Sequence, residues 1–133
     1  LTEAAGTRAG AAPEEIVRDF LEALSARELE RARAHLAPGF RMVFPGNAVM
    51  TTLEDLAERM AGRFRWARKT IERFDVAEAE DGVVVYCFGT LHGQWLDGSD
   101  YSGIRFVDRF LLRDGLIVDQ KVWNDMAEMR AGL

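Results

Sequence analysis

Asp108 is the residue of this sequence whose type and position most clearly suggest chemistry. In GIRFVDRFLLRDG, residues 103–115, every second residue from Ile104 to Leu112 is large and apolar except Asp108. An aspartate is almost never fully buried unless it is paired, and burial of an ionised carboxylate costs several kcal/mol. Burial also raises the pKa of the carboxyl group, and a neutral carboxylic acid can donate a hydrogen bond to a carbonyl group. Asp108 is therefore predicted to be protonated, to be paired, or to face a wet pocket.

Two hairpin turns place further side chains on the face of Asp108. A turn centred near Gly98 pairs residues 83–95 with 101–112 and is expected to place Phe88 opposite Asp108. A bulged turn at Asp114 and Gly115 adds the last strand and is expected to place Val122 beside Asp108 and Gln120 beside Phe110. Aromatic side chains with a few polar groups among them are typical of a small-molecule cavity, and also of a core whose polar groups are satisfied. We predict a pocket lined by Phe20, Met42, Phe44, Tyr86, Phe88, Thr90, Phe106, Phe110, Gln120, Val122, Trp123 and Asn124.

Three residues are candidates for acid/base catalysis: Asp108, His92 and Asp125. Each has a structural alternative. Asp108 would be satisfied by Tyr86, by Gln120 or by a backbone group, or would face solvent if the register slipped. His92 lies near a strand end, where a histidine is commonly part of the rim or the core. Asp125 precedes MAEMR and is also placed to cap that short helix.

Length and charge exclude several classes of protein. The 133 residues predict one domain, residues 13–133, preceded by a flexible tail of small and polar residues, 1–12. A net charge of −5 argues against nucleic-acid binding, and the basic run 63–73 is interpreted as a solvated face because Phe64, Trp66 and Ile71 interrupt it. No apolar stretch approaches the ~20 residues of a membrane span, so no membrane partner is expected.

Cysteine and histidine usage gives no sign of a disulfide or a metal. The single cysteine, Cys87, lies in the apolar run VVVYCFG and is interpreted as a small buried hydrophobe. The only histidines, His35 and His92, form no cluster with ligand spacing, and no glycine-rich phosphate loop is present. We therefore expect no metal, no nucleotide and no other cofactor, and a cytoplasmic location.

The elements that must position these residues follow from hydrophobic periodicity. Pro13 and the two glutamates after it predict a helix start, and Pro38 with Gly39 predicts a break. Thr51 or Thr52 is expected to cap a third helix. The predicted elements are helices at 13–25, 26–37 and from 51 onward, and strands at 40–44, 69–82, 83–95, 101–112 and 116–125. Helices separated in the sequence from a meander of four strands predict an α+β fold.

This order of elements resembles the nuclear transport factor 2-like superfamily. The segments FRMVFPG and VDRFLLRDGLIVDQKVWND carry the resemblance, which runs from Pro13 to Met129 and is similar to the SnoaL-like branch with its polyketide cyclases and relatives of ketosteroid isomerase. The resemblance implies a cone-like curved antiparallel sheet packed on the N-terminal helices, of the cystatin-like α+β barrel type. It also implies an apolar pocket in the mouth of the cone, and a homodimer.

The isomerase part of the resemblance is incomplete at two positions. Asp108, in VDRF, falls where ketosteroid isomerases keep the protonated aspartic acid of their oxyanion hole. Phe20 stands where those enzymes have a helix tyrosine, and Phe44 stands where they have the aspartate that acts as general base. A phenylalanine neither donates a hydrogen bond nor carries a proton, so steroid isomerisation by that mechanism is not expected.

Two other activities of the superfamily give different expectations. SnoaL-like cyclases carry a catalytic aspartate late in the last strand, which the resemblance places at Asp125, although the tryptophan of that pattern is shifted to Trp123. Epoxide hydrolases of the superfamily use two aspartates and an arginine. Arg105 is available, but strand alternation sends it to the face opposite Asp108, which argues against that mechanism.

The predicted function is therefore a pocket for a small apolar organic molecule. It would be a cofactor-free acid/base isomerase, cyclase or dehydratase acting on a polycyclic or terpenoid-like substrate. The alternatives are a binding protein without catalysis and an assembly subunit of the same fold. The assembly subunit predicts a cavity too small for a ligand, and an outer face richer in apolar residues than Arg41, Arg105, Arg109, Asp119 and Lys121 suggest.

Overall fold

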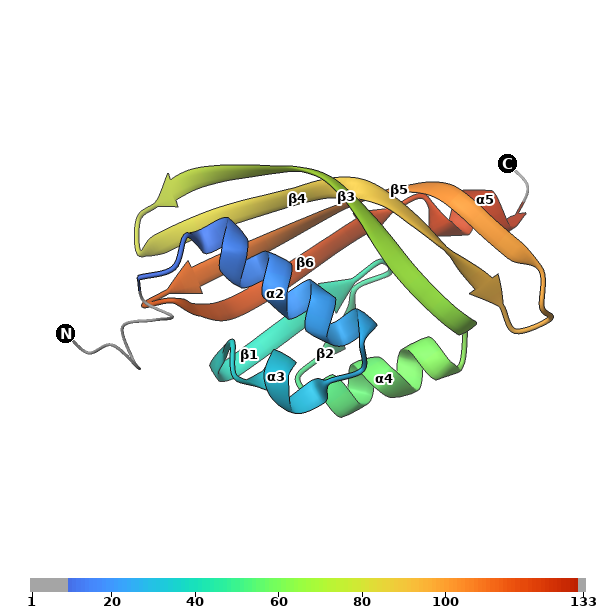
Figure 1. Cartoon of the computed structure of the whole chain (residues 1–133), viewed down its shortest axis with the longest axis horizontal. Helices are drawn as coiled ribbons and strands as arrows, with labels where there is room; N and C mark the ends of the chain where they lie inside the picture. The colour runs from blue at the N-terminus through green and yellow to red at the C-terminus, as the bar shows by residue number, and fades with distance from the viewer. Residues whose placement is uncertain (1–9, 132–133) are drawn as a thin grey trace.

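The computed structural model describes residues 10–131 as an α+β fold in which a curved sheet arches over a helix (Figure 1). The predicted flexible tail, residues 1–12, lies outside the described residues except for its last three. The elements in chain order are α2 (Pro13–Ser25), α3 (Leu29–Arg33), β1 (Leu36–Phe44), β2 (Ala48–Met50), α4 (Leu53–Ala61), β3 (Phe64–Ala79), β4 (Gly82–Trp95), β5 (Asp100–Arg113), β6 (Leu116–Asn124) and α5 (Met126–Ala131).

Helix α2 lies in the concave side of the sheet and supplies the centre of the core. It begins at Pro13 with Glu14 and Glu15 in its first turn, as the sequence predicts. Its buried residues are Ile16, Val17, Phe20, Leu21 and Ala23. Phe20 packs edge-on against Phe110 of the sheet with ring centroids 6.1 Å apart, so the helix is fixed to the strand that carries Asp108.

The second helix is shorter than predicted, because its last residues join the sheet. The expected helix 26–37 is reduced to α3, and β1 begins at Leu36, opposite Ile117 of β6. The backbone N–H of Ile117 donates to the carbonyl oxygen of His35 over 2.8 Å. The hydrogen bonds to β6 thus outweigh the helical preference of His35, Leu36 and Ala37. The short strand β2, which pairs with β1, was not predicted.

Helix α4 begins where the sequence indicates. Thr52 has an extended backbone, and its side-chain oxygen accepts a hydrogen bond from the backbone N–H of Asp55 over 3.0 Å. Leu53 and Leu56 are buried, while the remainder of the helix is exposed or half-buried. The cap fixes the start of a helix that, as described below, forms one wall of a cavity.

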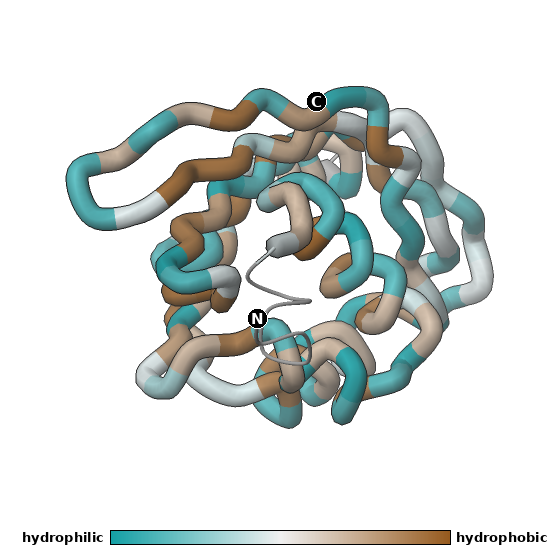
Figure 2. Tube along the Cα trace, turned by 60° about the vertical axis from the view of Figure 1, so that its left-hand side comes forward, coloured by the Kyte–Doolittle hydropathy of each residue, from teal (hydrophilic) through white to brown (hydrophobic). Residues whose placement is uncertain are grey.

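The sheet has six strands in the order β2-β1-β6-β5-β4-β3. The predicted meander of β3 to β6 is confirmed, and β1 adds a parallel pairing with β6 that the sequence did not indicate. Buried residues alternate with more exposed ones along β4 and β5, so that one side of each strand faces the interior. Figure 2 shows how hydrophobic and hydrophilic residues are distributed along the chain. Among residues 10–131 no helix is both long enough and apolar enough to cross a bilayer.

The register between β4 and β5 differs by one residue from the predicted one. Asp108 lies opposite Cys87 rather than Phe88, and Phe106 lies opposite Gly89. The turn is tighter than assumed, since the N–H of Trp95 donates to the carbonyl oxygen of Ser99. The register then shifts by one residue between Leu91 and Gly93, where the partner strand β5 contains Gly103 with a φ of 71°.

The register between β5 and β6 is the predicted one. Asp108 lies opposite Val122 and Phe110 lies opposite Gln120. The predicted irregularity after the hairpin is present, because the register shifts between Leu111 and Leu112. The two strands therefore bring Asp108 and Gln120 to the same inner face of the sheet.

Candidate functional site

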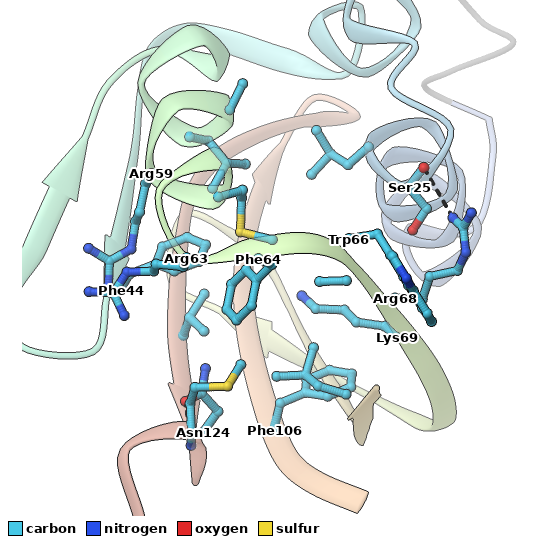
Figure 3. A pocket seen from close by; sticks show the side chains of 18 of the residues that line it. Ser25, Phe44, Arg59, Arg63, Phe64, Trp66, Arg68, Lys69, Phe106 and Asn124 are labelled. Atoms are coloured by element: carbon cyan, nitrogen blue, oxygen red, sulfur yellow. Dashed lines mark hydrogen bonds between the residues drawn. The ribbon is translucent and has the colours of Figure 1, made fainter. Parts of the chain in front are cut away.

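A large cavity lies between helix α4, the end of α2 and the concave side of the sheet. Its volume is about 920 Å³, within the range of roughly 300–1,000 Å³ typical of small-molecule sites. Most elements contribute lining residues, including Leu24 of α2, Met60 of α4, Leu91 of β4 and Met126 of α5. Figure 3 shows these walls, with polar side chains entering an otherwise apolar space.

Asp108 is fully buried and is paired with a lysine in the wall of this cavity. The Nζ atom of Lys69 forms an ion pair with Oδ2 of Asp108. Lys69 lines the cavity, whereas Asp108 does not, so the carboxyl group lies behind the lysine as seen from the cavity. The side chain of Lys69 is 21% exposed, that of Asp108 0%. The group of the pair that can contact a ligand is therefore the amine.

The surroundings of Asp108 act on its pKa in two directions. Burial raises the pKa of the carboxyl group, and the charge and hydrogen bond of Lys69, with a hydrogen bond from Gln120, oppose the rise. The Nε2 atom of Gln120 donates to Oδ2 over 3.5 Å. Oδ1 of Asp108 has no hydrogen-bond partner among the described residues. One oxygen is thus held by the lysine and by Gln120, and the other has no partner among the described residues.

Lys69 also packs on an aromatic ring of the cavity. Its Nζ atom lies 4.8 Å from the centroid of Phe106, which is 2% exposed and lies opposite Gly89. A Cβ atom at Gly89 would lie 2.0 Å from the carbonyl oxygen of Thr70 and 3.0 Å from the Phe106 ring. The absence of a side chain at this position thus lets β3 approach β4 and leaves room for the ring. Phe106 in turn supports the ammonium group.

Five of the predicted pocket residues line the cavity: Phe44, Phe106, Gln120, Val122 and Asn124. Three others, Phe20, Met42 and Phe110, are completely buried and belong to the core beside it. Both phenylalanines that replace polar groups of the isomerases are thus apolar wall or core residues. The site has no second carboxyl group or phenol at those two positions.

Three predicted pocket residues of β4 and the predicted catalytic residue His92 lie on the other face of the sheet. Tyr86, Phe88, Thr90 and His92 alternate with the buried residues Val85, Cys87, Gly89 and Leu91. This follows directly from the one-residue register shift, because each such shift exchanges the two faces of a strand. The ring of His92 packs edge-on against Trp66 at 5.8 Å. Trp123 also points away from the cavity and is 55% exposed.

Asp125 is held outside the cavity by an ion pair. Its Oδ2 atom lies 2.6 Å from Nε of Arg105, on the outer side of the sheet. The first N–H of α5, that of Met126, is bonded by the side chain of Asn124 rather than by Asp125. Neither Asp125 nor His92 lines the cavity, and neither contacts Asp108. The three predicted catalytic residues are therefore not brought together.

Cys87 lies directly opposite Asp108 and is fully buried, as predicted. Burial, with a smaller effect of the Asp108 charge, raises the pKa of its thiol to about 12. A thiol with this pKa is not a nucleophile at neutral pH. Within residues 10–131 no group of three histidine, cysteine, aspartate or glutamate side chains is placed to hold a metal ion.

Lys69 is the functional candidate that sequence reasoning missed. The basic run 63–73 was interpreted as a solvated face, but Arg63, Arg65, Arg68 and Lys69 line the cavity. The sequence contains an indication of this role, because Ala67, Lys69 and Ile71 are every second residue of a strand and therefore share one face. Both neighbours pack against the core. This is the same interruption of an apolar face that identified Asp108.

The profile of the SnoaL-like domain family matches residues 17–120, and no curated protein matches the sequence. An NTF2-like protein of unknown function from Burkholderia pseudomallei K96243 has a TM-score of 0.76 at 20% identity, over 90% of this chain and 95% of that one. The structure of TerC, co-crystallised with polyporic acid, has a TM-score of 0.75 at 18% identity, over 90% of this chain and 97% of TerC. The structure of a putative polyketide cyclase from Pseudomonas putida KT2440 has a TM-score of 0.67 at 18% identity, over 85% of this chain and 91% of that one. These likenesses establish the fold.

Proposed function

We propose, since this chain belongs to the SnoaL-like domain family, that its cavity binds a small, largely apolar organic molecule and performs acid/base chemistry on it without a cofactor. The observation that carries the proposal is the pair of Lys69 with the fully buried Asp108 in the wall of a cavity of about 920 Å³. An amine and a carboxyl group in apolar surroundings are the elements of general acid–base catalysis.

In this proposal Lys69 contacts the substrate and Asp108 acts through it. On enolisation the bond between the α-carbon and its proton breaks and a water molecule takes the proton. The ammonium group of Lys69 donates a hydrogen bond to the carbonyl oxygen and stabilises the negative charge that develops there. Asp108 holds the lysine in position and balances its charge. Isomerisation, cyclisation and dehydration of a polycyclic or terpenoid-like carbonyl compound all pass through such a step. The proposal assigns no role to His92 or Asp125.

The related structures support a pocket for organic molecules in this fold. TerC was co-crystallised with polyporic acid, and the protein from Pseudomonas putida is described as a putative polyketide cyclase. The volume of the cavity also argues against the assembly subunit, which requires a pocket too small for a ligand. A binding protein without turnover remains the second candidate, and the presence of the amine–carboxyl pair favours the enzyme over it.

Binding of the uncharged polycycle 1-pyrenebutanol, followed by fluorescence, tests whether the cavity takes a ligand. We expect Ala57→Trp/Ala61→Trp, which places two indole rings at exposed positions of the lining, to weaken binding at least tenfold. Val76→Trp/Ala77→Trp adds two indole rings at exposed positions outside the lining and should bind as the wild type does. Equal binding by all three proteins, or none by the wild type, would contradict the proposal.

The same proposal includes a homodimer through the outer face of the sheet. Tyr86 and Phe88 lie on this face with their rings stacked at 6.4 Å, and Trp123 lies opposite Val107. The face is therefore more apolar than the sequence suggested, and a second copy of this chain would cover it. Self-association about a twofold axis would cover the exposed ring of Trp123.

Trp123→Glu is expected to convert the dimer to a monomer, because it places a charge in the centre of that face. Val76→Glu is the matched control, since Val76 is 46% exposed on β3 and lies opposite the buried Val85 on the inner side of the sheet, whereas Trp123 is 55% exposed on the outer side. The mass of each protein in solution, measured by light scattering after gel filtration, gives the answer. A monomeric wild type, or a Trp123→Glu variant that stays dimeric, argues against the interface.

A cytoplasmic location completes the proposal. Its support is that Cys87, the single cysteine of the chain, is a buried free thiol, so that no disulfide contributes to the fold.

A further inference from the structure

The lining of the cavity is strongly basic, although the protein is acidic. Six arginines and Lys69 line it, and none of its other described residues is an aspartate or a glutamate. The arginines are Arg27, Arg59, Arg63, Arg65, Arg68 and Arg130. The chain as a whole carries a net charge of −5. The positive charges are thus concentrated around one cavity rather than spread over the surface.

These six arginines also differ in their partners from most of the other described arginines, of which only Arg18 and Arg41 likewise form no ion pair. Elsewhere in residues 10–131, six arginines form ion pairs with carboxylates, for example Arg33 with Glu54 at 2.9 Å and Arg73 with Asp75 at 2.7 Å. None of the six around the cavity forms an ion pair with a carboxylate of the described residues. Three of them, Arg27, Arg65 and Arg68, donate to backbone carbonyl oxygens, which leaves their charge uncompensated.

Arg59 and Arg63 form the most concentrated part of this charge. Figure 3 shows the two side chains together beside Phe44, at one side of the cavity, while Lys69 enters it from another. The guanidinium carbon of Arg59 lies 5.7 Å from the centroid of the Phe44 ring. Burial, and then the nearby charge of Arg63, lower the pKa of Arg59. The folded chain therefore keeps two like charges close together at an apolar wall.

The C-terminus of helix α4 explains only part of this arrangement. Arg59 lies in the last turn of α4, where a positive charge is favourable by roughly 0.3–1 kcal/mol. That effect does not extend to Arg65 and Arg68 on β3 or to Arg130 on α5. Asp97 lies near the rim, and its pKa is lowered first by a hydrogen bond from Ser99 and to a lesser degree by the charges of Arg130 and Arg65. It is not part of the lining.

We propose that the ligand of this cavity carries a carboxylate, which Arg59 and Arg63 bind, while its apolar body extends over Phe44 and Phe64 toward Lys69. This inference rests on the proposed function and specifies its substrate class as amphipathic organic acids. Two guanidinium groups are suited to a carboxylate because each offers paired N–H donors. The apolar lining covers the rest of the ligand. A carboxylate at Arg59 and Arg63 orients the molecule so that its other end meets the amine.

Two probes that share one polycycle separate the anion from the apolar body. They are 1-pyrenebutanoic acid, which is ionised at pH 7.5, and 1-pyrenebutanol, which has no charge. We expect the wild type to bind the acid about tenfold to a hundredfold more tightly, the range typical of hydrogen bonds to a charged group. Fluorescence titrations at low and at high sodium chloride should show that only binding of the acid weakens with salt.

Arg59→Gln/Arg63→Gln is expected to remove the preference for the acid and to leave the dissociation constant of the alcohol within about twofold of the wild type. The unchanged alcohol binding shows that the variant is folded and the cavity intact. Arg41→Gln/Arg73→Gln is the matched control: it removes two positive charges from positions outside the lining. It should keep the preference, which excludes a general effect of net charge.

Each result distinguishes this inference from the function on which it rests. Equal affinity of the wild type for acid and alcohol overturns the carboxylate site and leaves a pocket for uncharged molecules. A preference that survives in Arg59→Gln/Arg63→Gln overturns the assignment to these two arginines. Absence of binding by both probes contradicts the pocket itself, and with it both proposals.

Discussion

Replacing Lys69 with methionine is expected to lower the free energy of unfolding by about 3–5 kcal/mol at pH 8, the range found when one partner of a buried ion pair is removed. Methionine fills a similar volume and keeps the apolar contact with Phe106, so the loss is mainly electrostatic. Asp108, which is 0% exposed, would keep only the weak hydrogen bond from Gln120. Unfolding in urea, followed by tryptophan fluorescence, measures the difference.

The cost of Lys69→Met should be smaller at pH 4 than at pH 8. The pKa of Asp108 is raised in the folded protein above its ordinary value of 3.8 because of burial. The contribution of such a carboxyl group to the free energy of unfolding is fully present below its pKa in the unfolded chain. It is lost as the pH rises through its pKa in the folded protein. Without the ammonium group, which opposes the rise, the folded pKa increases further. The variant therefore accepts a proton on Asp108 near pH 4 and recovers part of its stability.

Two further variants identify the cause of the loss. Lys121→Met removes an exposed lysine on the outer face, and its effect should stay within about 0.5 kcal/mol. Lys69→Met/Asp108→Leu removes both charges and should be more stable than Lys69→Met alone, because no buried carboxylate is left unpaired. A single variant as stable as the wild type at pH 8, or a double variant no better than the single, would show that the pair is not a buried ion pair.

Loss of the amine is also expected to reduce catalysis of enolisation by a factor of about 10²–10⁴, the usual contribution of a general acid or base. The exchange of the α-protons of 2-tetralone with D₂O, followed by proton NMR, measures this step on an apolar bicyclic ketone. The wild type should accelerate the exchange over buffer. Lys69→Met should lose the acceleration, because no donor then faces the carbonyl oxygen.

The remaining variants separate chemistry from stability in this assay. Lys69→Met/Asp108→Leu should be as inactive as Lys69→Met although it is more stable, and Lys121→Met should be as active as the wild type. Asp108→Asn keeps the size of the side chain but removes the negative charge that balances the charge of Lys69, so we expect an intermediate rate and an altered pH profile. A wild type that binds 1-pyrenebutanol but does not accelerate exchange would support a binding protein in place of an enzyme.

The sequence was sufficient to identify Asp108 but not its partner. An aspartate between Phe106 and Phe110 on an apolar face predicts burial, and the carboxyl group is fully buried with a raised pKa. Lys69 lies 39 residues away in the sequence. Its pairing depends on the irregular register of β3, which shifts between Phe64 and Trp66 and again between Ile71 and Arg73. Such shifts decide which side chains face inward, and no local pattern specifies them.

A similar limit explains the side chains of β4. The alternation in VYCFGTLH is compatible with either face, because Tyr86 and Phe88 are as apolar as Val85 and Cys87. The hairpin turn therefore determined the prediction, and a bulge opposite His92 reversed it. On β6 the sequence pattern distinguishes the faces more clearly: Val122 and Gln120 alternate with Lys121 and Asp119, and there the predicted register is confirmed. Register is predictable where the two faces differ in polarity.

The parallel pairing of β1 with β6 has a consequence for the order of folding. Strands β3 to β6 are joined by short hairpins, whereas Leu36 and Ile117 must meet across 80 intervening residues of chain. Contacts between neighbours in sequence form quickly, and closing a long loop carries an entropic cost, so the hairpins are expected to form before the N-terminal third docks. The cavity contains residues of both parts, from Leu24 and Met60 to Phe106 and Asn124. A refolding chain should therefore gain sheet structure first, and capture a pyrene probe only in the last kinetic phase.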